Sequence, residues 1–421
     1  MSRRAHDLVV VGLGYVGLSL VQAAVHAGLA VAGLDTDTEK VAALNSGRSY
    51  VDDLSDDEVA ALGAAGFRAT TDPAVLGQAA CIVICVPTPL NVDDGAPDLA
   101  AVRAAAGAVA ERLRPDVTVV LESTSYPGTT EEVLVPLLEA GSGLRAGVDF
   151  HVAYSPERID PGNPVYGLAN TPKVVGGLTP ACTDAAETLY AKFVGQVVRV
   201  KGTREAEMAK LLENTYRHVN IALVNEMLVF SDELGIDLWD AIDAAATKPF
   251  GFQAFYPGPG VGGHCIPIDP NYLSYKVKSL GYPFRFVELA QEINARMPAY
   301  VVLRAAGLLN EHRKAINGSR VLLLGVTYKA DIADERESPA RPLARRLLDL
   351  GAELSYHDPH VDQWSVNGWQ GTCVDLATTL PDTDLVILLQ NHRCYDTADL
   401  AGAPAILDTR GRLTGPNVHR L

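Results

Sequence analysis

One cysteine stands in a segment of the chain, residues 250–270, that is rich in glycine and proline. Cys265 comes three residues after Gly262, and Asp269 comes four residues after the cysteine. Such a segment offers no helix or strand face for a thiol to pack on, and its glycines let the backbone approach a ligand closely. Because the thiolate is a strong nucleophile, the segment predicts a catalytic cysteine. A generic buried cysteine is the alternative.

Three glycines near the N-terminus have the spacing of a dinucleotide-binding turn. Gly12, Gly14 and Gly17 follow the apolar run Asp7–Val11 and open a helical pattern over Tyr15–Ala27. In a strand–turn–helix unit of this kind the first glycine makes the tight turn, the second admits a pyrophosphate, and the third packs the helix against the strand. The free N–H groups of the helix N-terminus then attract phosphate. The alternative is a glycine-rich turn without a ligand.

A carboxylate at the end of the second predicted strand, residues 30–35, indicates which dinucleotide binds. Asp35 lies about where an acid meets the ribose 2′-hydroxyl in a unit of this type. A carboxylate there accepts hydrogen bonds from the hydroxyls and repels a 2′-phosphate. The sequence therefore predicts NAD⁺ rather than NADP⁺ as the cofactor.

A thiol beside a nicotinamide has a specific chemical use. Removal of a hydride from an alcohol gives an aldehyde, which the Cys265 thiolate could trap as a thiohemiacetal. A second hydride transfer would give a thioester, and water would release the acid. The two motifs together therefore favour a four-electron oxidation of an alcohol to an acid.

Polar residues on a predicted helix, residues 205–235, could stabilise the oxyanion of such a reaction. Lys210 and Asn214 are four residues apart and Arg217 follows three later, so they share one face. A solvated helix face explains them equally well. The opposite face is predicted to carry Leu211, Leu212, Thr215, Val219 and Ala222.

Further polar residues follow strand-like runs. Thr88, Ser123 and Thr124 each come just after an apolar run, and Glu157 follows another. The carboxyl ends of parallel strands are where an open α/β sheet binds its ligands, so these side chains are candidate contacts. Turn formation and helix capping explain the hydroxyl residues about equally well.

The elements that would position these residues alternate along the chain, which predicts a parallel sheet covered by helices on both faces. Predicted strands cover residues 7–11, 30–35, 81–86, 117–122, 320–325, 353–357, 384–389 and 405–408, and predicted helices cover 15–27, 38–45, 99–112, 205–235, 286–311 and 339–350. The fold class is therefore α/β, with two Rossmann-like, doubly wound parallel-sheet domains joined by a long central helical region. We expect a cofactor domain at 1–202, a helical domain with the cysteine segment at 203–313, and a second α/β domain at 314–421.

Composition excludes several classes of function. The chain has 421 residues and a formal net charge of −16 without a Lys- or Arg-rich run, which argues against a nucleic-acid partner. No apolar stretch reaches the ~18 residues that a membrane-spanning helix needs, so a soluble protein is expected. The six cysteines have neither disulfide-framework nor metal-site spacing, which favours a reducing, cytoplasmic location and no metal.

Taken together, the motifs resemble the nucleotide-sugar 6-dehydrogenase family, which includes UDP-glucose and UDP-N-acetylhexosamine 6-dehydrogenases. The likeness runs from about Val9 to Arg410. It rests on Gly12–Gly17, Val86–Pro89, Glu122–Thr130, Ser155–Gly162, Lys210 with Asn214, Gly262–Asp269, and Tyr328–Pro339.

The resemblance implies roles for individual residues. Cys265 would carry the thiohemiacetal and the thioester, Lys210 and Asn214 would stabilise the oxyanion, and Glu157 would serve in thioester hydrolysis. Asp269 and Thr124 would hold the water used in proton transfer. Implied cofactor contacts are Gly12, Gly14, Tyr15, Val16, Gly17, Asp35, Lys40, Thr88, Thr124 and Arg336. Implied substrate contacts are Glu157, Arg158, Lys210, Asn214, Tyr256, Gly262 and Lys329. The C-terminal domain would bind the nucleotide, and the long central helix would form a homodimer interface.

The subgroup is less sharply defined by these motifs. Residues 155–163 and 263–270 look more like the N-acetylhexosamine branch than the common UDP-glucose branch. Either UDP or dTDP could be the nucleotide, and glucose, GlcNAc and ManNAc are all candidate sugars. Ala330 follows Lys329 where many relatives have a second lysine.

Three other functions remain as alternatives. A two-electron hydroxyacid or sugar-acid dehydrogenase would use the same cofactor domain without covalent catalysis. An epimerase would keep its NAD bound, and a non-catalytic regulator would only sense it. None of these three proteins would need Cys265.

Overall fold

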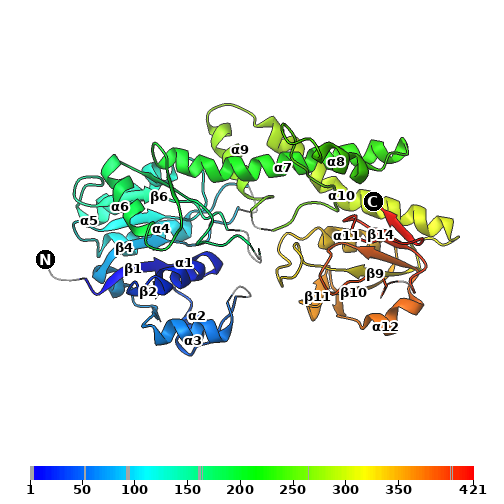
Figure 1. The fold of residues 1–421 in the computed structure, drawn as a ribbon, viewed down its shortest axis with the longest axis horizontal. Coiled ribbons are helices and arrows are strands. Elements are labelled where there is room, and N and C mark those ends of the chain that lie inside the picture. The colour runs from blue at the N-terminus through cyan, green and yellow to red at the C-terminus, as the bar shows by residue number, and fades with distance from the viewer. Residues whose placement is uncertain are drawn as a thin grey trace. The chain divides into compact units, whose positions relative to one another are not determined.

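A computed structural model describes residues 4–51, 54–91, 95–159, 163, 165–263, 265–398, 400 and 402–421. The chain forms two compact units (Figure 1). The first comprises residues 1–213 and 271–282, and the second comprises residues 214–270 and 283–421. The boundary between them falls within the long helix α7 (Thr203–Glu233).

The first unit is built on a mixed sheet of eight strands in the order β3-β2-β1-β4-β5-β6-β7-β8. Its strands are β1 (His6–Val11), β2 (Val31–Leu34), β3 (Arg68–Thr70), β4 (Ala79–Ile84), β5 (Thr118–Leu121), β6 (His151–Tyr154), β7 (Lys173–Gly177) and β8 (Val197–Arg199). The strands from β3 to β6 are mutually parallel. β7 pairs antiparallel with β6, and β8 is parallel to β7. The turn of direction at β7 was not predicted.

Helices cover both faces of this sheet because successive side chains of its buried strands point to opposite sides. Leu8 and Val10 of β1 pack with α1 (Tyr15–His26) and α6 (Pro180–Tyr190). Val9 and Val11 pack with α4 (Ala100–Ala110) and α5 (Val135–Ser142) on the other side. The remaining elements of this unit are α2 (Thr38–Asn45), α3 (Asp56–Ala64), η1 (Pro73–Gln78), η2 (Thr130–Leu134) and most of α9 (Asp269–Ser279).

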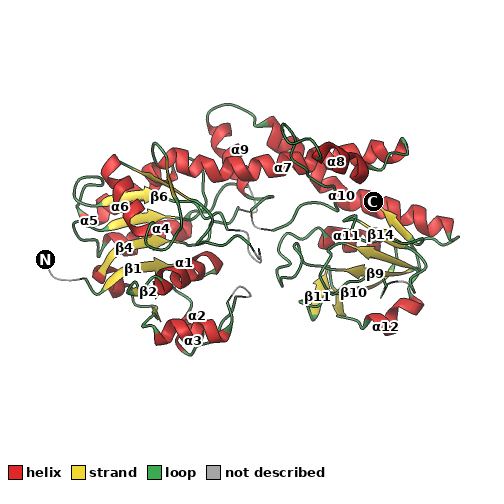
Figure 2. Cartoon of the chain, in the orientation of Figure 1, coloured by secondary structure: helices red, strands yellow, loops and turns green. Residues whose placement is uncertain are grey.

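The second unit contains a parallel sheet of five strands in the order β10-β9-β13-β14-β15. Its strands are β9 (Arg320–Leu324), β10 (Glu353–His357), β13 (Leu385–Leu388), β14 (Ile406–Asp408) and β15 (Val418–Arg420), and β11 (Gln363–Val366) and β12 (Trp369–Thr372) form a hairpin. The helices are α8 (Leu238–Ala246), α10 (Arg285–Glu311), α11 (Ala340–Asp349), α12 (Leu376–Thr379) and η3 (Leu380–Asp382), together with the C-terminal part of α7. Figure 2 shows the helices of this unit in red and its strands in yellow.

The core of the second unit also has two faces. Val321 and Leu323 of β9 pack with α10 and α11, whereas Leu322 and Leu324 belong to a separate cluster on the other face. The predicted fold class is confirmed: two α/β sheets, largely parallel, are joined by a long helix. The division at 1–202, 203–313 and 314–421 stays a prediction. In the part of the chain that the structure describes, no helix combines the length and apolar character needed to cross a bilayer.

Candidate active site

The glycine-rich turn between β1 and α1 has the geometry that a phosphate group needs. Gly12 has φ +91°, and a Cβ there would lie 2.7 Å from the Cys85 carbonyl oxygen. A Cβ on Gly17 would lie 1.9 Å from the Gly12 oxygen, whereas one on Gly14 would meet nothing within 4 Å. Gly12 and Gly17 are therefore required by close packing, and the space beside Gly14 is open to a ligand. The N-terminus of α1, at Tyr15 and Val16, adjoins that space.

Asp35 stands at the end of β2 and supports the same turn. Its Oδ2 atom accepts a hydrogen bond from Leu13 N at 2.8 Å, and Oδ1 accepts one from Asp37 N at 3.0 Å. Lys40 lies on α2 with its Nζ 3.8 Å from the Asp37 carboxylate. A fixed carboxylate at this strand end, beside open space at Gly14, fits the ribose and pyrophosphate of a dinucleotide.

The segments that follow β4 and β5 are tied together at the carboxyl edge of the sheet. The Thr88 hydroxyl donates to the Thr124 carbonyl oxygen at 2.7 Å, and the Ser123 hydroxyl donates to the Val86 oxygen at 2.7 Å. The Tyr272 hydroxyl of α9 donates to the Thr88 oxygen. The structure therefore brings Thr88 and Thr124 together, as expected of contacts at one ligand edge.

Glu157 belongs to a buried cluster of charges that was not predicted. Lys173 Nζ lies 3.1 Å from a carboxylate oxygen of Glu157 and 3.1 Å from one of Glu122. The Lys173 side chain is 3 % exposed. The other Glu157 oxygen accepts hydrogen bonds from the N–H groups of Arg158 and Ile159, both at 2.6 Å. The Tyr190 hydroxyl donates to Glu122.

These contacts decide the charge of Glu157. Burial alone would raise the pKa of Glu157, but Lys173 and the backbone N–H of Ile159 outweigh burial and hold that pKa below its ordinary value. Lys210 acts in the same direction. Burial raises the pKa of Glu122, which Lys173 only partly offsets. Lys173 and the backbone N–H groups therefore favour the ionised form of Glu157 and orient its carboxylate. The only sequence signal for Lys173 is a lysine directly in front of the apolar run 174–177.

The Arg158 side chain contacts α7 rather than Glu157. Its guanidinium lies 2.7 Å from the Glu213 carboxylate and donates to the Pro172 carbonyl oxygen at 2.7 Å. Arg158 is thus held by protein groups, and its role as a substrate contact stays a prediction. Residues 160–162 of the same motif, and His264 of the cysteine segment, lie outside the described residues.

In the second unit, the cysteine segment meets α7 through a buried carboxylate. Cys265 is exposed, and its carbonyl oxygen accepts a hydrogen bond from Asp269 N at 2.8 Å. The Asn214 amide of α7 donates to Asp269 Oδ2 at 2.6 Å. Asn214 is 8 % exposed and Asp269 is 3 % exposed. Three of the predicted catalytic residues therefore lie in one hydrogen-bonded arrangement.

Asparagines anchor the first part of the cysteine segment. Gly258 N donates to Asn225 Oδ1 at 2.9 Å, and the Asn225 amide donates to Asn294 Oδ1 of α10 at 2.9 Å. Asn225 was not among the predicted site residues. Its signal was another amide eleven residues after Asn214, which places both amides on the same face of α7.

The second part of the cysteine segment packs against the segment that follows β9. A Cβ on Gly262 would lie 2.7 Å from the Tyr328 Cβ, and Gly263 N donates to the Arg336 carbonyl oxygen at 3.1 Å. Gly263 has φ +86°. Only glycine permits this close approach, so the path of the chain before Cys265 is fixed by its neighbours.

The other predicted ligand residues of this unit lie near its surface. The Tyr256 hydroxyl donates to the Asp243 carboxylate at 2.6 Å. Arg336 is exposed and its guanidinium lies 2.6 Å from the Asp334 carboxylate. Lys329 is half-buried in the segment after β9. Their contacts with cofactor or substrate stay predictions.

The predicted division of α7 into a polar and an apolar face is wrong in part. Asn214 is buried on the same side as Thr215, whereas Leu212, expected to be buried, is 59 % exposed. The reason is that the Asn214 amide is paired with Asp269, so a polar side chain can be buried there. His218 is also buried, and burial lowers its pKa to about 4.

Comparison with protein families finds three matches in chain order. Residues 6–194 match the NAD binding domain of the UDP-glucose/GDP-mannose dehydrogenase family, residues 204–296 match its central domain, and residues 322–415 match its UDP binding domain.

Individual relatives match over nearly the same span. UDP-N-acetyl-D-mannosamine dehydrogenase of Pyrococcus horikoshii is 36 % identical, covering 91 % of this chain and 89 % of the relative. UDP-N-acetyl-D-glucosamine 6-dehydrogenase of Pseudomonas aeruginosa is 36 % identical over 84 % of this chain and 83 % of the relative. The solved structure of the Pyrococcus horikoshii UDP-D-ManNAc dehydrogenase superposes with a TM-score of 0.89 at 32 % identity, covering 98 % of each chain.

Proposed function

The chain belongs to the UDP-glucose/GDP-mannose dehydrogenase family, and on that premise we propose that it oxidises the C6 alcohol of a nucleotide-linked hexose to a carboxylate through covalent catalysis by Cys265. It is an NAD-dependent nucleotide-sugar dehydrogenase. The observation that supports the covalent route is the arrangement of Asn214, Asp269 and Cys265, in which the backbone of an exposed cysteine is hydrogen-bonded to the residue whose buried carboxylate accepts from Asn214.

The proposed reaction passes through two oxidations at one carbon. NAD⁺, when bound, supplies the hydride acceptor. The Cys265 thiolate adds to the carbon of the intermediate aldehyde, and the resulting thiohemiacetal becomes a thioester after the second oxidation. Water then attacks the thioester carbon, the C–S bond breaks, and the thiolate is restored. Two electrons leave the sugar in each oxidation.

The other candidate residues have roles that suit their chemistry. The amide of Asn214 and the ammonium group of Lys210 would donate to the oxyanion that develops when sulfur adds. Asp269 and Thr124 would hold the water molecule that exchanges protons with the substrate hydroxyl. Glu157, kept ionised by Lys173, would accept the proton of the hydrolytic water.

Ligand contacts outside the catalytic group complete the proposal. The glycine turn with Asp35, Lys40 and Thr88 would hold NAD⁺, and Arg336 would approach the cofactor. The nucleotide-sugar would contact Lys329, Tyr256, Gly262 and Arg158. A cytoplasmic location is part of this proposal, because a catalytic thiol must stay reduced.

The substrate class that we propose is a UDP-N-acetylhexosamine. Two relatives that are 36 % identical act on UDP-N-acetyl-D-mannosamine and UDP-N-acetyl-D-glucosamine, as their names state. Glucose as the sugar and dTDP as the nucleotide are the alternatives. A two-electron dehydrogenase without covalent catalysis is the second candidate reaction, and it would leave Cys265 unused.

The ratio of NADH formed to sugar nucleotide consumed tests the reaction. A limiting amount of one sugar nucleotide is supplied at a time: UDP-ManNAc, UDP-GlcNAc, UDP-glucose or dTDP-glucose. The mass of the product is measured by mass spectrometry. We expect two NADH per sugar and the mass change of alcohol-to-acid conversion with a UDP-N-acetylhexosamine. One NADH per sugar would eliminate the thioester route and favour the two-electron reaction.

We also propose that the protein is a homodimer in which a second copy covers part of α7. Tyr216, Leu223 and Phe230 recur every seven residues, are 45 %, 51 % and 47 % exposed, and therefore form an apolar stripe. Leu234, 67 % exposed, extends the stripe. Stripes of this spacing pair with another helix, and a second copy of α7 offers one.

Replacement of apolar residues of the stripe by aspartate tests whether the protein dimerises through this face. Leu223→Asp combined with Phe230→Asp should weaken dimerisation about 100-fold or more, because burial of an unpaired carboxylate costs several kcal/mol. Sedimentation velocity measures the change from dimer to monomer. Leu350→Asp, at a position 50 % exposed outside the stripe, is the matched control and should stay dimeric. A monomeric wild type, or a dimeric double variant, contradicts the proposal.

A further inference from the structure

The segment from Gly325 to Ser338, which follows strand β9, is held in an unfavourable backbone conformation. Asp331 has φ 62° and Glu337 has φ 52°, which lie in the left-handed region that non-glycine residues seldom adopt. The segment contains Lys329, which the proposed function places in contact with the nucleotide-sugar. Contacts outside the segment must therefore hold it in this conformation.

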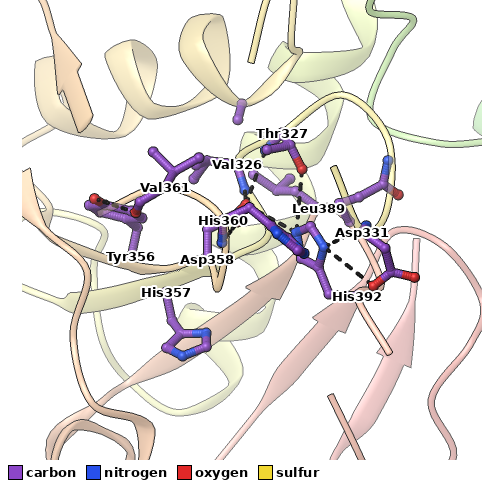
Figure 3. A network of polar contacts seen from close by, with 12 residues as sticks. Val326, Thr327, Asp331, Tyr356, His357, Asp358, His360, Val361, Leu389 and His392 are labelled. Carbon is purple, nitrogen blue, oxygen red and sulfur yellow. Dashed lines mark hydrogen bonds and ion pairs between the residues drawn. The ribbon is translucent and has the colours of Figure 1, made fainter. Parts of the chain in front are cut away.

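Asp358 holds one side of the segment through hydrogen bonds. It follows β10, one neighbour of β9 in the sheet, and its side chain is 0 % exposed. Its Oδ2 atom accepts hydrogen bonds from Val326 N at 2.7 Å and Thr327 N at 3.2 Å, and Oδ1 accepts one from His360 N at 2.9 Å (Figure 3). The first turn of the segment is thus fixed by a buried carboxylate.

His392 holds the other side of the segment through hydrogen bonds. It follows β13, the other neighbour of β9, and its side chain is also 0 % exposed. Its Nδ1 accepts a hydrogen bond from Asp331 N at 2.9 Å, so Nδ1 carries no proton. Its Nε2–H then points to Asp358 Oδ2 at 3.0 Å, with Thr327 Oγ1 at 3.3 Å. The tautomer protonated at Nε2 fits these hydrogen bonds, and Figure 3 shows the His392 ring between Thr327 and Asp331.

The backbone at Lys329 is the centre of these contacts. The Thr327 hydroxyl donates to the Lys329 carbonyl oxygen at 2.9 Å, and the Gln390 amide donates to the Tyr328 oxygen at 2.6 Å. Arg393 Nε lies 2.7 Å from Asp331 Oδ2. Thr327, Tyr328 and Asp331 are therefore all hydrogen-bonded to groups that follow β10 or β13.

A metal ion is a poorer explanation of this cluster. Asp331, His360 and His392 each offer one ligand atom, and these atoms lie within 4.8 Å of one another. However, both ring nitrogens of His392 are already in hydrogen bonds, and the Asp331 carboxylate is paired with Arg393. A metal would have to displace the Asp331 N–H group that the backbone conformation presents.

We propose that Asp358 and His392 are positioning residues that hold the Lys329 segment in the shape that binds the diphosphate of the nucleotide-sugar. This inference rests on the proposed function. The nucleotide matters because residues 322–415 match a UDP binding domain. Because the segment is already held on both sides, it does not have to become ordered when the ligand binds. This favours tight binding.

The test measures UDP binding to the full-length chain by calorimetry, together with steady-state kinetics. His392→Ala should weaken UDP binding and raise the sugar-nucleotide KM about tenfold, with kcat within about threefold, because the segment is displaced and the chemistry is not. Thr327→Val, a milder change, should shift the same two quantities in the same direction. His392→Asn retains an acceptor for Asp331 N and should restore most of the affinity.

The matched control is His357→Asn, because His357 contacts Tyr395 and points away from the segment in Figure 3. It should leave UDP affinity unchanged. Unchanged affinity in both His392→Ala and Thr327→Val, even with a lowered melting temperature, would overturn the positioning role alone. A wild type that binds no UDP would overturn the positioning role and the proposed function together, whereas UDP binding without NADH formation would count against the proposed function only.

Discussion

Cys265→Ser should abolish formation of the sugar acid while the protein still folds and binds NAD⁺. Loss of the nucleophile removes both covalent intermediates, so kcat for acid formation should fall by roughly 10⁴-fold or more. Cys265 is exposed, and the hydrogen bond from Asp269 N goes to its backbone oxygen. The substitution therefore leaves that contact in place and changes only the atom that reacts.

The measurement is the yield of acid and of NADH per sugar, with hydroxylamine present to capture an aldehyde. The thioester route predicts that the variant gives at most one NADH per sugar and a captured aldehyde. Cys394→Ser is the matched control, because Cys394 is the other exposed cysteine among the described residues, and it should retain full activity. Two NADH per sugar from Cys265→Ser at an undiminished rate would rule out covalent catalysis by Cys265.

Several inner strands of both sheets could be predicted from the sequence because they are buried on both faces, but β7, an inner strand of the first sheet, was not predicted. β1, β4, β5, β9 and β13 lie between neighbours and are built largely from Val, Ile and Leu, which gives continuous apolar runs. β8 and β15 were not predicted. They are three-residue edge strands with partly exposed side chains, so their sequences lack such a run.

The residues of the candidate site also fall into those that could be predicted from the sequence and those that could not. Cys265 and Asp269 could be singled out because their local sequence, a Gly- and Pro-rich segment, is itself unusual. Lys173 and His392 could not, because their significance depends on partners that the sheet brings together. Lys173 lies between carboxylates from the ends of β5 and β6, and His392 faces Asp358 across β9. No spacing along the chain encodes such a pairing.

Lys173→Met should be the most destabilising change at the candidate site. The substitution keeps the length of the side chain but leaves Glu122 and Glu157 buried without their shared cation. Removal of one partner from a buried ion pair costs about 3–5 kcal/mol of unfolding free energy. For a unit of this size, thermal denaturation should show a melting temperature lower by roughly 6–20 °C. Lys192→Met, at an exposed position of the same unit, should change it little.

The pH dependence of the Lys173→Met variant identifies the cause. In the wild type Lys173 holds the pKa of Glu157 below its ordinary value, so this contribution to stability is present near neutral pH and is lost only as the pH falls through that lowered pKa. Without the cation, burial raises the pKa of both carboxyl groups. The folded variant then binds more protons than the unfolded chain, and its stability should increase as the pH is lowered from 8 to 5.

Turnover should report the same change at Glu157. Because a protonated Glu157 cannot accept a proton from water, Lys173→Met should slow thioester hydrolysis more than the preceding oxidations. Intact-protein mass spectrometry during turnover should then detect an acyl adduct on Cys265, and Lys173→Arg, which retains the cation, should show much less. A variant with wild-type stability at neutral pH, no gain on acidification and no adduct would show that Lys173 does not set the charge of Glu157.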